Sequence, residues 1–390
     1  MAGAVKSYET ASGRRWEVRY RKPDGAQTRK RGFKTKRDAE TYAAGVVVSK
    51  ATGDYVDPAR GRITIGELST AWLRKKSGLK PSSYHSIEVA WTVHVEPRWG
   101  HIAVKDVTAS AVETWIQDMV EGVAPVTRKR ETKQTTGGRS ASVVLRALGV
   151  LAGILDDAQR DRRIHRNPAR GLENLPRKTA KKDRRYLSDA EAAAFAKAVA
   201  DPVRGPLVIF LAYTGLRWGE AVGLRVRDLN TVRRRVHVRQ NAVEVDGEIE
   251  IGEPKTWERR SVPYPAFLAT TLRGLAKGKG PDAYLFAGDL GGVIRRPKTD
   301  EDSGSWFRAA QTAAGIERLT IHDLRHTAAS LAISAGAHVK AVQRMLGHKS
   351  AAMTLDTYAD LFEDDLDDVA VRMDERGREA AAVALASLAA

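Results

Sequence analysis

Two stretches of the sequence fit neither a helical nor a strand period, and they divide the chain into three parts. Residues 53–61 contain Pro58 and two glycines, which is typical of a linker. Residues 176–185 form a charge run, Pro-Arg-Lys-Thr-Ala-Lys-Lys-Asp-Arg-Arg. A chain of 390 residues is also too long for a single typical hydrophobic core. We therefore predict domains over residues 1–57, 63–175 and 187–390, with an interdomain linker over 176–186.

The first part has the pattern of a small β-sheet covered by one helix. Residues 14–20 alternate apolar and polar side chains, Pro23-Asp24-Gly25 is a turn signal, and residues 27–33 fit a returning strand. Residues 36–49 then place apolar side chains on one helical face. Before Ile63 there are about fifteen Lys and Arg residues against seven Asp and Glu residues. A charged sheet face left free for nucleic acid is therefore predicted, the alternative being an appendage that packs on the rest.

The middle part is predicted to be a small all-α domain. Helices are expected over residues 65–76, 81–94, 110–120 and 139–160, the first opened by a capping box at Thr64. The fourth has the clearest period, because apolar side chains recur at helical spacing at Val143, Leu145, Leu148, Leu151, Ile154 and Leu155. Polar residues 122–140 are predicted to form a loop that contacts backbone phosphate.

The third part mixes helices with short strands. Ser188 caps a predicted helix that runs to about Ala200, and residues 206–213 fit a buried helix. Residues 226–245 alternate as strands do, and residues 248–263 are predicted to form a hairpin around Lys255. The rest is mostly helical. The predicted fold class is thus multidomain and mainly α with small β elements: a sheet-plus-helix domain, an all-α domain and a mixed α+β domain.

Composition limits the partners and the chemistry. A net charge of +17 favours a polyanion as partner, although a basic protein without one is the simpler alternative. The run over residues 176–185 is predicted to lie along a phosphate backbone, the alternative being a solvated tether. There is no cysteine, which excludes disulfides, thiolate nucleophiles and Cys-ligated zinc. Without a membrane-length apolar run or a signal-peptide core at the N-terminus, we expect a cytoplasmic location.

Arginine, histidine and tyrosine gather in short motifs of the third part. Arg217 lies within Thr-Gly-Leu-Arg-Trp-Gly-Glu, and His322 and Arg325 lie within His-Asp-Leu-Arg-His; His348 follows a Leu-Gly pair, and Tyr358 comes ten residues later. Guanidinium groups suit the charge that builds on phosphate oxygens during phosphodiester cleavage, and removing one is expected to cost on the order of 10²–10³ in rate. A tyrosine could attack the phosphorus if cationic neighbours favour its ionised form. No metal is required.

These residues resemble the tyrosine recombinase family, specifically the phage-type integrases. The resemblance rests on Arg217 with Glu220, His322 with Arg325, and then His348 and Tyr358 in the family's order and spacing. The family also carries a lysine in a β-hairpin between the two arginines, which Lys255 matches. The three-part layout is similar too, so the resemblance covers nearly the whole chain: an arm-type DNA-binding domain, a core-binding (SAM-like) domain and a catalytic domain with a C-terminal tail.

The resemblance implies a role for each residue. Tyr358 would attack the phosphate and form a 3′-phosphotyrosine link, and Arg217 and Arg325 would clamp that phosphate. Lys255 would be the general acid, His322 would assist proton transfer and His348 would hydrogen-bond the phosphate. Glu220 would orient its neighbours. The DNA-binding residues we expect are Arg19, Arg29, Arg31, Lys178, Lys181, Lys182 and Arg184. No cofactor and no metal are expected.

Singly, each of these residues has an ordinary structural explanation. Tyr358 is one of ten tyrosines, and Lys255 is one of many lysines. His322 and His326 lie four residues apart and could form half of a metal site, but Asp323 replaces the glutamate of the zinc-protease motif and no third ligand follows at the usual spacing. We interpret His326 as a packing residue or one that supports the site. The order and spacing of the whole set favour the recombinase.

The implied function is site-specific recombination that integrates, and could also excise, a phage or mobile element. The alternatives are a chromosome-dimer resolvase, a type IB topoisomerase, a DNA-binding regulator without catalysis, and a metallohydrolase. The expected partners are double-stranded attachment-site DNA and, on that DNA, three further copies of the chain in a homo-tetramer, with residues 380–390 docking on a neighbour or on their own domain. A host DNA-bending protein and a directionality factor are further candidates, and the expected location is the cytoplasm of the host cell, at the nucleoid.

Overall fold

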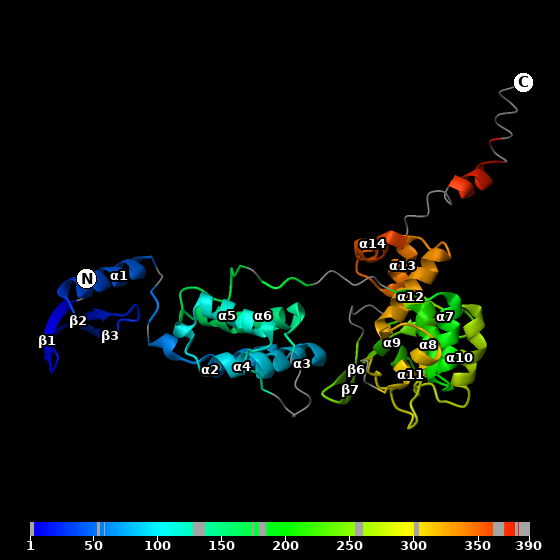
Figure 1. Ribbon diagram of the computed structural model, residues 1–390, viewed down its shortest axis with the longest axis horizontal. Coiled ribbons are helices and arrows are strands. Elements are labelled where there is room, and N and C mark those ends of the chain that lie inside the picture. The colour runs from blue at the N-terminus through cyan, green and yellow to red at the C-terminus, as the bar shows by residue number, and fades with distance from the viewer. Residues whose placement is uncertain are drawn as a thin grey trace, which may run out of the picture. The chain divides into compact units, whose positions relative to one another are not determined.

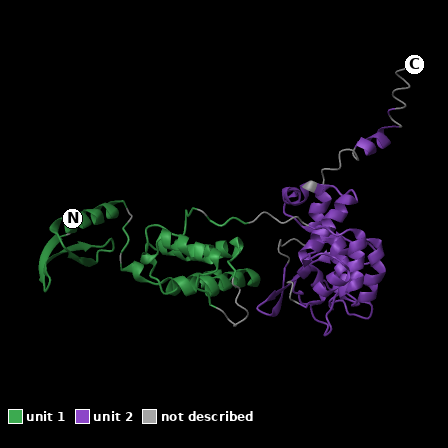
Figure 2. Ribbon diagram, in the orientation of Figure 1, with its two compact units in different colours: residues 1–180 green, residues 181–390 purple. Residues whose placement is uncertain are grey.

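The computed structural model describes most of the chain and divides it into two compact units, residues 1–180 and 181–390 (Figure 2). The described residues are 4–52, 55–57, 59–127, 137–173, 175–178, 185–253, 260–299, 304–361, 370–378 and 381. The boundary between the units falls inside the predicted linker 176–186. The first unit holds two separate hydrophobic clusters, one in a sheet and one among helices. The finer division near residues 57–63 stays a prediction.

An antiparallel sheet with one helix forms the start of the first unit (Figure 1). The strands are β1 (Ala4–Thr10), β2 (Gly13–Arg21) and β3 (Gln27–Phe33) in that spatial order, and the helix is α1 (Lys36–Ala51). Val18 and Tyr20 of β2 pack with Ala39, Ala43 and Val46 of the helix. The predicted strands and helix are confirmed, and β1 adds an edge strand that the alternation analysis did not locate.

On the other side of β2, Glu17 is 2% exposed although it is charged. Its carboxylate accepts hydrogen bonds from Nε of Arg19 at 2.6 Å and from Nε of Arg31 at 2.8 Å. Both arginine side chains remain about half exposed, at 51% and 50%. The two hydrogen bonds lower the pKa of Glu17. This carboxylate therefore holds two basic side chains in place on the exposed face.

The rest of the first unit is helical, as predicted. It contains α2 (Ile65–Lys76), α3 (Pro81–Ala90), α4 (Glu96–Trp99), α5 (Ala109–Glu121) and α6 (Ala141–Arg160). Short 3₁₀ turns lie at Arg60–Arg62 and Val104–Asp106. The Thr64 capping box is present. The helix expected over residues 81–94 ends earlier, because one π-helical turn (Trp91–Val95) replaces its last residues before α4.

The core of these helices is built around α6, which buries nine residues, and around two tryptophans. Trp99 and Trp115 meet edge to face, with ring centroids 5.9 Å apart. Trp72 of α2 packs so closely on α6 that a Cβ added to Gly153 would lie 2.7 Å from its ring. Residues 128–136 of the loop predicted to contact phosphate lie outside the described residues.

The second unit begins with α7 (Asp189–Ala198), α8 (Arg204–Thr214) and α9 (Trp218–Val222). Ser188 and Glu191 form the capping box that starts α7, and α8 is the buried helix that the sequence predicts. Short strands follow: β4 (Leu229–Asn230), β5 (Arg235–Val238), β6 (Asn241–Val245), β7 (Glu248–Gly252) and β8 (Arg260–Pro263). Among them lie the 3₁₀ turns Val226–Asp228 and Ala266–Leu268, the latter before α10 (Ala269–Ala276).

The predicted hairpin over residues 248–263 is wrong in its pairing. Among the described residues, β7 pairs with β6, whereas β8 pairs with β5 in a different sheet of order β4-β5-β8. The physical reason is that Asp246 and Gly247, both at positive φ, make a two-residue tight turn between Val245 and Glu248. Lys255 lies in the connection between these two sheets, outside the described residues.

The last part of the second unit is a series of helices: α11 (Trp306–Ala313), α12 (Ile321–Ser334), α13 (Val339–Leu346) and α14 (Ala351–Tyr358), followed by the 3₁₀ turn Ala359–Leu361. The helix α12 packs along α8, and this brings residues more than one hundred positions apart together. None of the helices in the described part of the chain is long and apolar enough to span a membrane. The predicted docking segment, residues 380–390, lies outside the described residues apart from Ala381.

Candidate functional site

Arg217 is the first residue of the site along the chain, and a sharp chain reversal positions it. The helix α8 ends at Thr214, and Gly215 follows in the left-handed conformation, at φ +63°. A Cβ on Gly215 would lie 2.6 Å from Leu346, so both the backbone angle and the packing require glycine here. Arg217 then caps α9 from the N-terminal side. Its side chain is 27% exposed.

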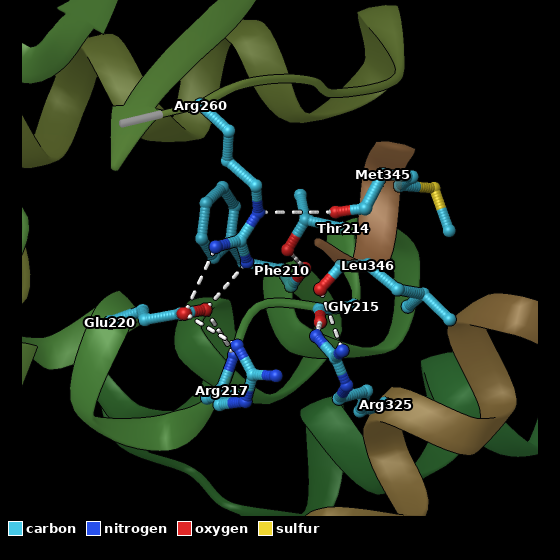
Figure 3. A network of polar contacts seen from close by, with 9 residues as sticks. All are labelled: Phe210, Thr214, Gly215, Arg217, Glu220, Arg260, Arg325, Met345 and Leu346. Carbon is cyan, nitrogen blue, oxygen red and sulfur yellow. Dashed lines mark hydrogen bonds and ion pairs between the residues drawn. The ribbon is translucent and has the colours of Figure 1, made fainter. Parts of the chain in front are cut away.

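Glu220 joins two arginines from different elements (Figure 3). Its carboxylate accepts from the backbone N–H of Arg217 at 2.9 Å and from the guanidinium of the same residue at 2.9 Å. Arg260 of β8 donates two more hydrogen bonds, of 3.0 and 2.6 Å. Burial raises the pKa of Glu220, but hydrogen bonding by Arg260 and the charges of both arginines outweigh it and bring the pKa to about 2. Glu220 is therefore ionised and holds Arg217 in place.

Arg325 is 3% exposed and is fixed by two backbone carbonyls (Figure 3). It donates to the oxygen of Gly215 at 2.5 Å and to the oxygen of Leu346 at 2.6 Å. Burial, with the positive charge of Arg217, lowers the pKa of Arg325 to about 9. The guanidinium of Arg325 still carries its charge at neutral pH and lies near that of Arg217. A bound anion would stabilise two neighbouring positive charges of this kind.

His348 lies just after α13, which ends at Gly347 in the left-handed conformation, at φ +66°. Its Nδ1 lies 3.0 Å from Oγ1 of Thr354, a fully buried residue of α14. Burial lowers the pKa of His348 to about 4, and the charges of Arg325 and Arg217 act in the same direction. His348 is thus a neutral ring at physiological pH and can exchange a hydrogen bond with a bound phosphate.

His322 lines a cavity of about 450 Å³ together with Arg217 and Arg325. The cavity also has apolar walls, among them Leu216, Val222, Ile294 and Ile321. Burial and the positive charges of Arg325 and Arg217 lower the pKa of His322, against an opposing effect of Asp323. The site thus places arginine side chains in the wall of an open cavity that can receive a phosphodiester.

Tyr358 is the last residue of α14 and is 1% exposed. Its hydroxyl oxygen lies 2.7 Å from Nδ1 of His326. The phenol is also close enough to Arg325 for its charge to raise the pKa of that arginine. The structure therefore places Tyr358 near Arg325, and its role as the nucleophile stays a prediction. His326 lies one turn after His322 on α12, and its contact with the tyrosine is not a feature that residue spacing indicated.

The other predicted catalytic and DNA-binding residues are not placed at this site by the structure. Lys255, Lys181, Lys182 and Arg184 lie outside the described residues, and Lys178 is exposed. Arg19, Arg29 and Arg31 lie on the N-terminal sheet, in the other unit. Their DNA-binding roles stay predictions.

Three residues contact the site although the sequence analysis did not assign them to it. These are Arg260 and Thr354, which the sequence did not single out, and His326, which was interpreted as a packing or supporting residue. Only the four-residue spacing of His326 from His322, on the same helical face, was a signal in the sequence. Among the described residues, no group of three or more His, Cys, Asp or Glu side chains is arranged to hold a metal ion.

Comparisons with known proteins identify a family match and several similar proteins. Residues 186–364 match the model of the phage integrase family. The integrase of Mycobacterium phage L5 is 27% identical over 339 residues, covering 83% of this chain and 84% of that protein. A putative prophage phiRv2 integrase of Mycobacterium tuberculosis is 25% identical over 368 residues, covering 90% of each chain.

Solved structures share the fold. The Tn1549 transposon integrase, in complex with transposon right end DNA, matches with a TM-score of 0.61 at 22% identity, over 80% of this chain and 99% of that one. A lambda integrase tetramer bound to a Holliday junction matches with a TM-score of 0.53 at 16% identity, over 88% of this chain and 96% of that one. The multidomain, mainly helical fold class is thereby confirmed.

Proposed function

The chain belongs to the phage integrase family of tyrosine recombinases, through residues 186–364, and on this premise we propose how its residues cut and rejoin DNA. The protein is a site-specific recombinase of the integrase type, an enzyme that breaks and rejoins DNA strands. The observation that supports the mechanism is that Arg217, His322 and Arg325 line one cavity, with Tyr358 close enough to Arg325 to interact with its charge. We propose that it inserts the genome of a phage or another mobile element.

Cleavage proceeds by attack of the Tyr358 hydroxyl on phosphorus. The new O–P bond is a 3′-phosphotyrosine ester, and the bond to the 5′ oxygen breaks. Arg217 and Arg325 neutralise the charge that develops on the non-bridging oxygens, a task for which their planar forks are suited. His348 donates a hydrogen bond to the phosphate and His322 assists proton transfer. Lys255 protonates the leaving 5′ oxygen. Because the ester keeps the bond energy, the reverse attack by a 5′ hydroxyl rejoins the strand.

On DNA, four copies of the chain hold two attachment-site duplexes. Exchange of four strands in pairs needs four nucleophiles, and closed cyclic symmetry provides them through head-to-tail contacts. Residues 1–57 bind accessory arm sites through the basic sheet face, and residues 63–175 and 187–390 clamp the crossover duplex. The linker residues Lys178, Lys181, Lys182 and Arg184 follow the phosphate backbone. The protein acts at the host nucleoid, where a DNA-bending protein and a directionality factor are candidate partners.

A covalent trap tests this function. The purified chain is incubated with nicked duplexes that tile the chromosome segment carrying its gene, and the products are resolved on a denaturing gel. The expected result is a protein–DNA adduct with one duplex that Tyr358→Phe abolishes. Absence of an adduct with every duplex, or an adduct that survives Tyr358→Phe, would contradict the proposal. Two-site recombination without supercoil relaxation then separates an integrase from a topoisomerase.

A further inference from the structure

We infer that His326 is the catalytic proton acceptor for Tyr358, an inference that rests on the proposed role of Tyr358 as the nucleophile. The contact is direct. Nδ1 of His326 lies 2.7 Å from the tyrosine oxygen, within the range of a hydrogen bond that can carry a proton. The ring centroids are 5.6 Å apart, with an angle of 62° between their planes. His326 therefore touches the reacting atom itself.

The fold holds this pair in place from two sides. Tyr358 packs in a hydrophobic cluster with Ala329 and Ile333, which follow His326 on α12. On the other side, the ring of His322 meets His326 edge to face, with centroids 4.9 Å apart. The proposal requires the tautomer in which Nδ1 accepts from the phenol and the other nitrogen carries the ring proton. The orientation of a general base is thus built before DNA arrives.

The two histidines of α12 have different positions, which separates their roles. His322 lines the cavity with Arg217 and Arg325, where the phosphate is proposed to bind. His326, one helical turn later, faces the nucleophile. An ordinary phenol, with a pKa near 10, has to lose its proton as it attacks near neutrality. The group that already shares a hydrogen bond with that phenol is the one that can accept the proton without a further movement.

Each bond and proton of the proposed step has a source and a destination. As the Tyr358 oxygen bonds to phosphorus, its proton moves to Nδ1 of His326, which becomes an imidazolium. The bond from phosphorus to the 5′ oxygen breaks with its electron pair, and that oxygen takes a proton from the general acid, for which Lys255 is proposed. In the rejoining step the protons return to their donors. Arg325 stabilises the phenolate character that develops on Tyr358 in between.

His326→Asn tests the role, because the asparagine amide occupies nearly the position of Nδ1 but does not accept a proton at neutral pH. The adduct assay of the proposed function is used, with the nicked duplex on which the wild-type chain forms its Tyr358 adduct. We expect cleavage to slow by about 10²–10⁴-fold. In the same variant, replacing Tyr358 by trifluorotyrosine, whose phenol is more acidic, is expected to restore about tenfold or more of the lost rate.

Controls separate this inference from folding and from the proposed function. His338→Asn changes an exposed histidine that caps α13 through its own Nδ1, and it is expected to leave the cleavage rate unchanged. Non-covalent DNA binding and thermal unfolding of His326→Asn report whether the variant is folded. If the variant is destabilised, the comparison of tyrosine with trifluorotyrosine within it still decides the role. Cleavage by His326→Asn at the wild-type rate, or a slow variant that trifluorotyrosine does not accelerate, would overturn the inference; a wild-type chain that forms no adduct would instead count against the proposed function.

Discussion

The carboxylate of Glu220 and the guanidinium of Arg260 are joined by two hydrogen bonds, of 3.0 and 2.6 Å, across forty positions of the chain. Both groups are nearly excluded from solvent, with side chains 1% and 10% exposed. The same carboxylate binds Arg217. Arg260 and Arg217, which is proposed to bind the phosphate, therefore share one acceptor.

Glu220→Gln is expected to destabilise the second unit by about 3–5 kcal/mol, because it leaves two guanidinium groups near one another without their counter-charge. It is also expected to slow DNA cleavage, since Arg217 loses its anchor. The measurement is urea unfolding, with the adduct assay beside it. Glu244→Gln is the matched control: its pair with Arg295 is exposed on both sides, so a change of about 1 kcal/mol or less is expected. Equal losses of unfolding free energy in the two variants would show that the shared carboxylate stabilises the fold no more than an exposed ion pair does.

The surroundings of two glycines of α6 predict opposite effects on stability when each is replaced by alanine. Gly153→Ala would place a Cβ 2.7 Å from the ring of Trp72, whereas Gly149→Ala meets nothing within 4 Å. The first is expected to destabilise the helical part of the chain by about 1–3 kcal/mol through overpacking. The second is expected to stabilise it by about 0.5–1 kcal/mol, because alanine loses less backbone entropy in a helix than glycine does. Thermal unfolding of the two variants checks the sign, and a stabilising Gly153→Ala would disprove the packing of Trp72 described here.

The lowered pKa of His348 predicts a loss of stability in mild acid. In the folded protein this pKa is about 4, against 6.5 for a free histidine. The unfolded chain therefore binds a proton first as the pH falls, so the stability is complete above about pH 6.5 and declines towards pH 4. Urea unfolding across this range measures the slope. His348→Asn, which keeps an amide near Thr354, is expected to flatten part of the decline, and His338→Asn is expected to leave it unchanged. Parallel profiles for His348→Asn and the wild-type chain would contradict the assignment.

The sheet face of the N-terminal part predicts a salt-dependent contribution to DNA affinity. Arg29 lies directly opposite Arg19 on neighbouring strands. If Arg29 neutralises one phosphate, Arg29→Ala reduces the slope of log affinity against log salt by about 1. Lys36→Ala, on α1, removes an exposed lysine that pairs with Glu40 and serves as the control of equal charge. Fluorescence anisotropy with arm-site DNA at several salt concentrations gives both slopes, and an unchanged slope for Arg29→Ala would remove this residue from the DNA interface.

The sequence predicted the residues of the site better than their contacts. Arg217, Arg325, His322, His348 and Tyr358 were identified because their residue types and spacing match one chemistry, and the structure gathers them. The hairpin around Lys255 was predicted wrongly, because alternation shows which residues form strands but not which strands pair. The true pairing depends on the turn at Asp246-Gly247 and on β5, which lies more than twenty positions before β8.

The sequence by itself determined the mainly helical fold class, the capping boxes at Thr64 and Ser188, and the residue types available for the site, because periodicity, caps and residue types are local properties. Only the tertiary structure decided that Arg260 shares Glu220 with Arg217, that Arg325 is held by the carbonyls of Gly215 and Leu346, and that Tyr358 meets His326. Apart from the local pair of Arg217 with Glu220, these contacts join residues 21 to 110 positions apart. They depend on how elements distant in the sequence pack, such as α12 against α8 and α13 against β8, and no local pattern encodes how such faces meet.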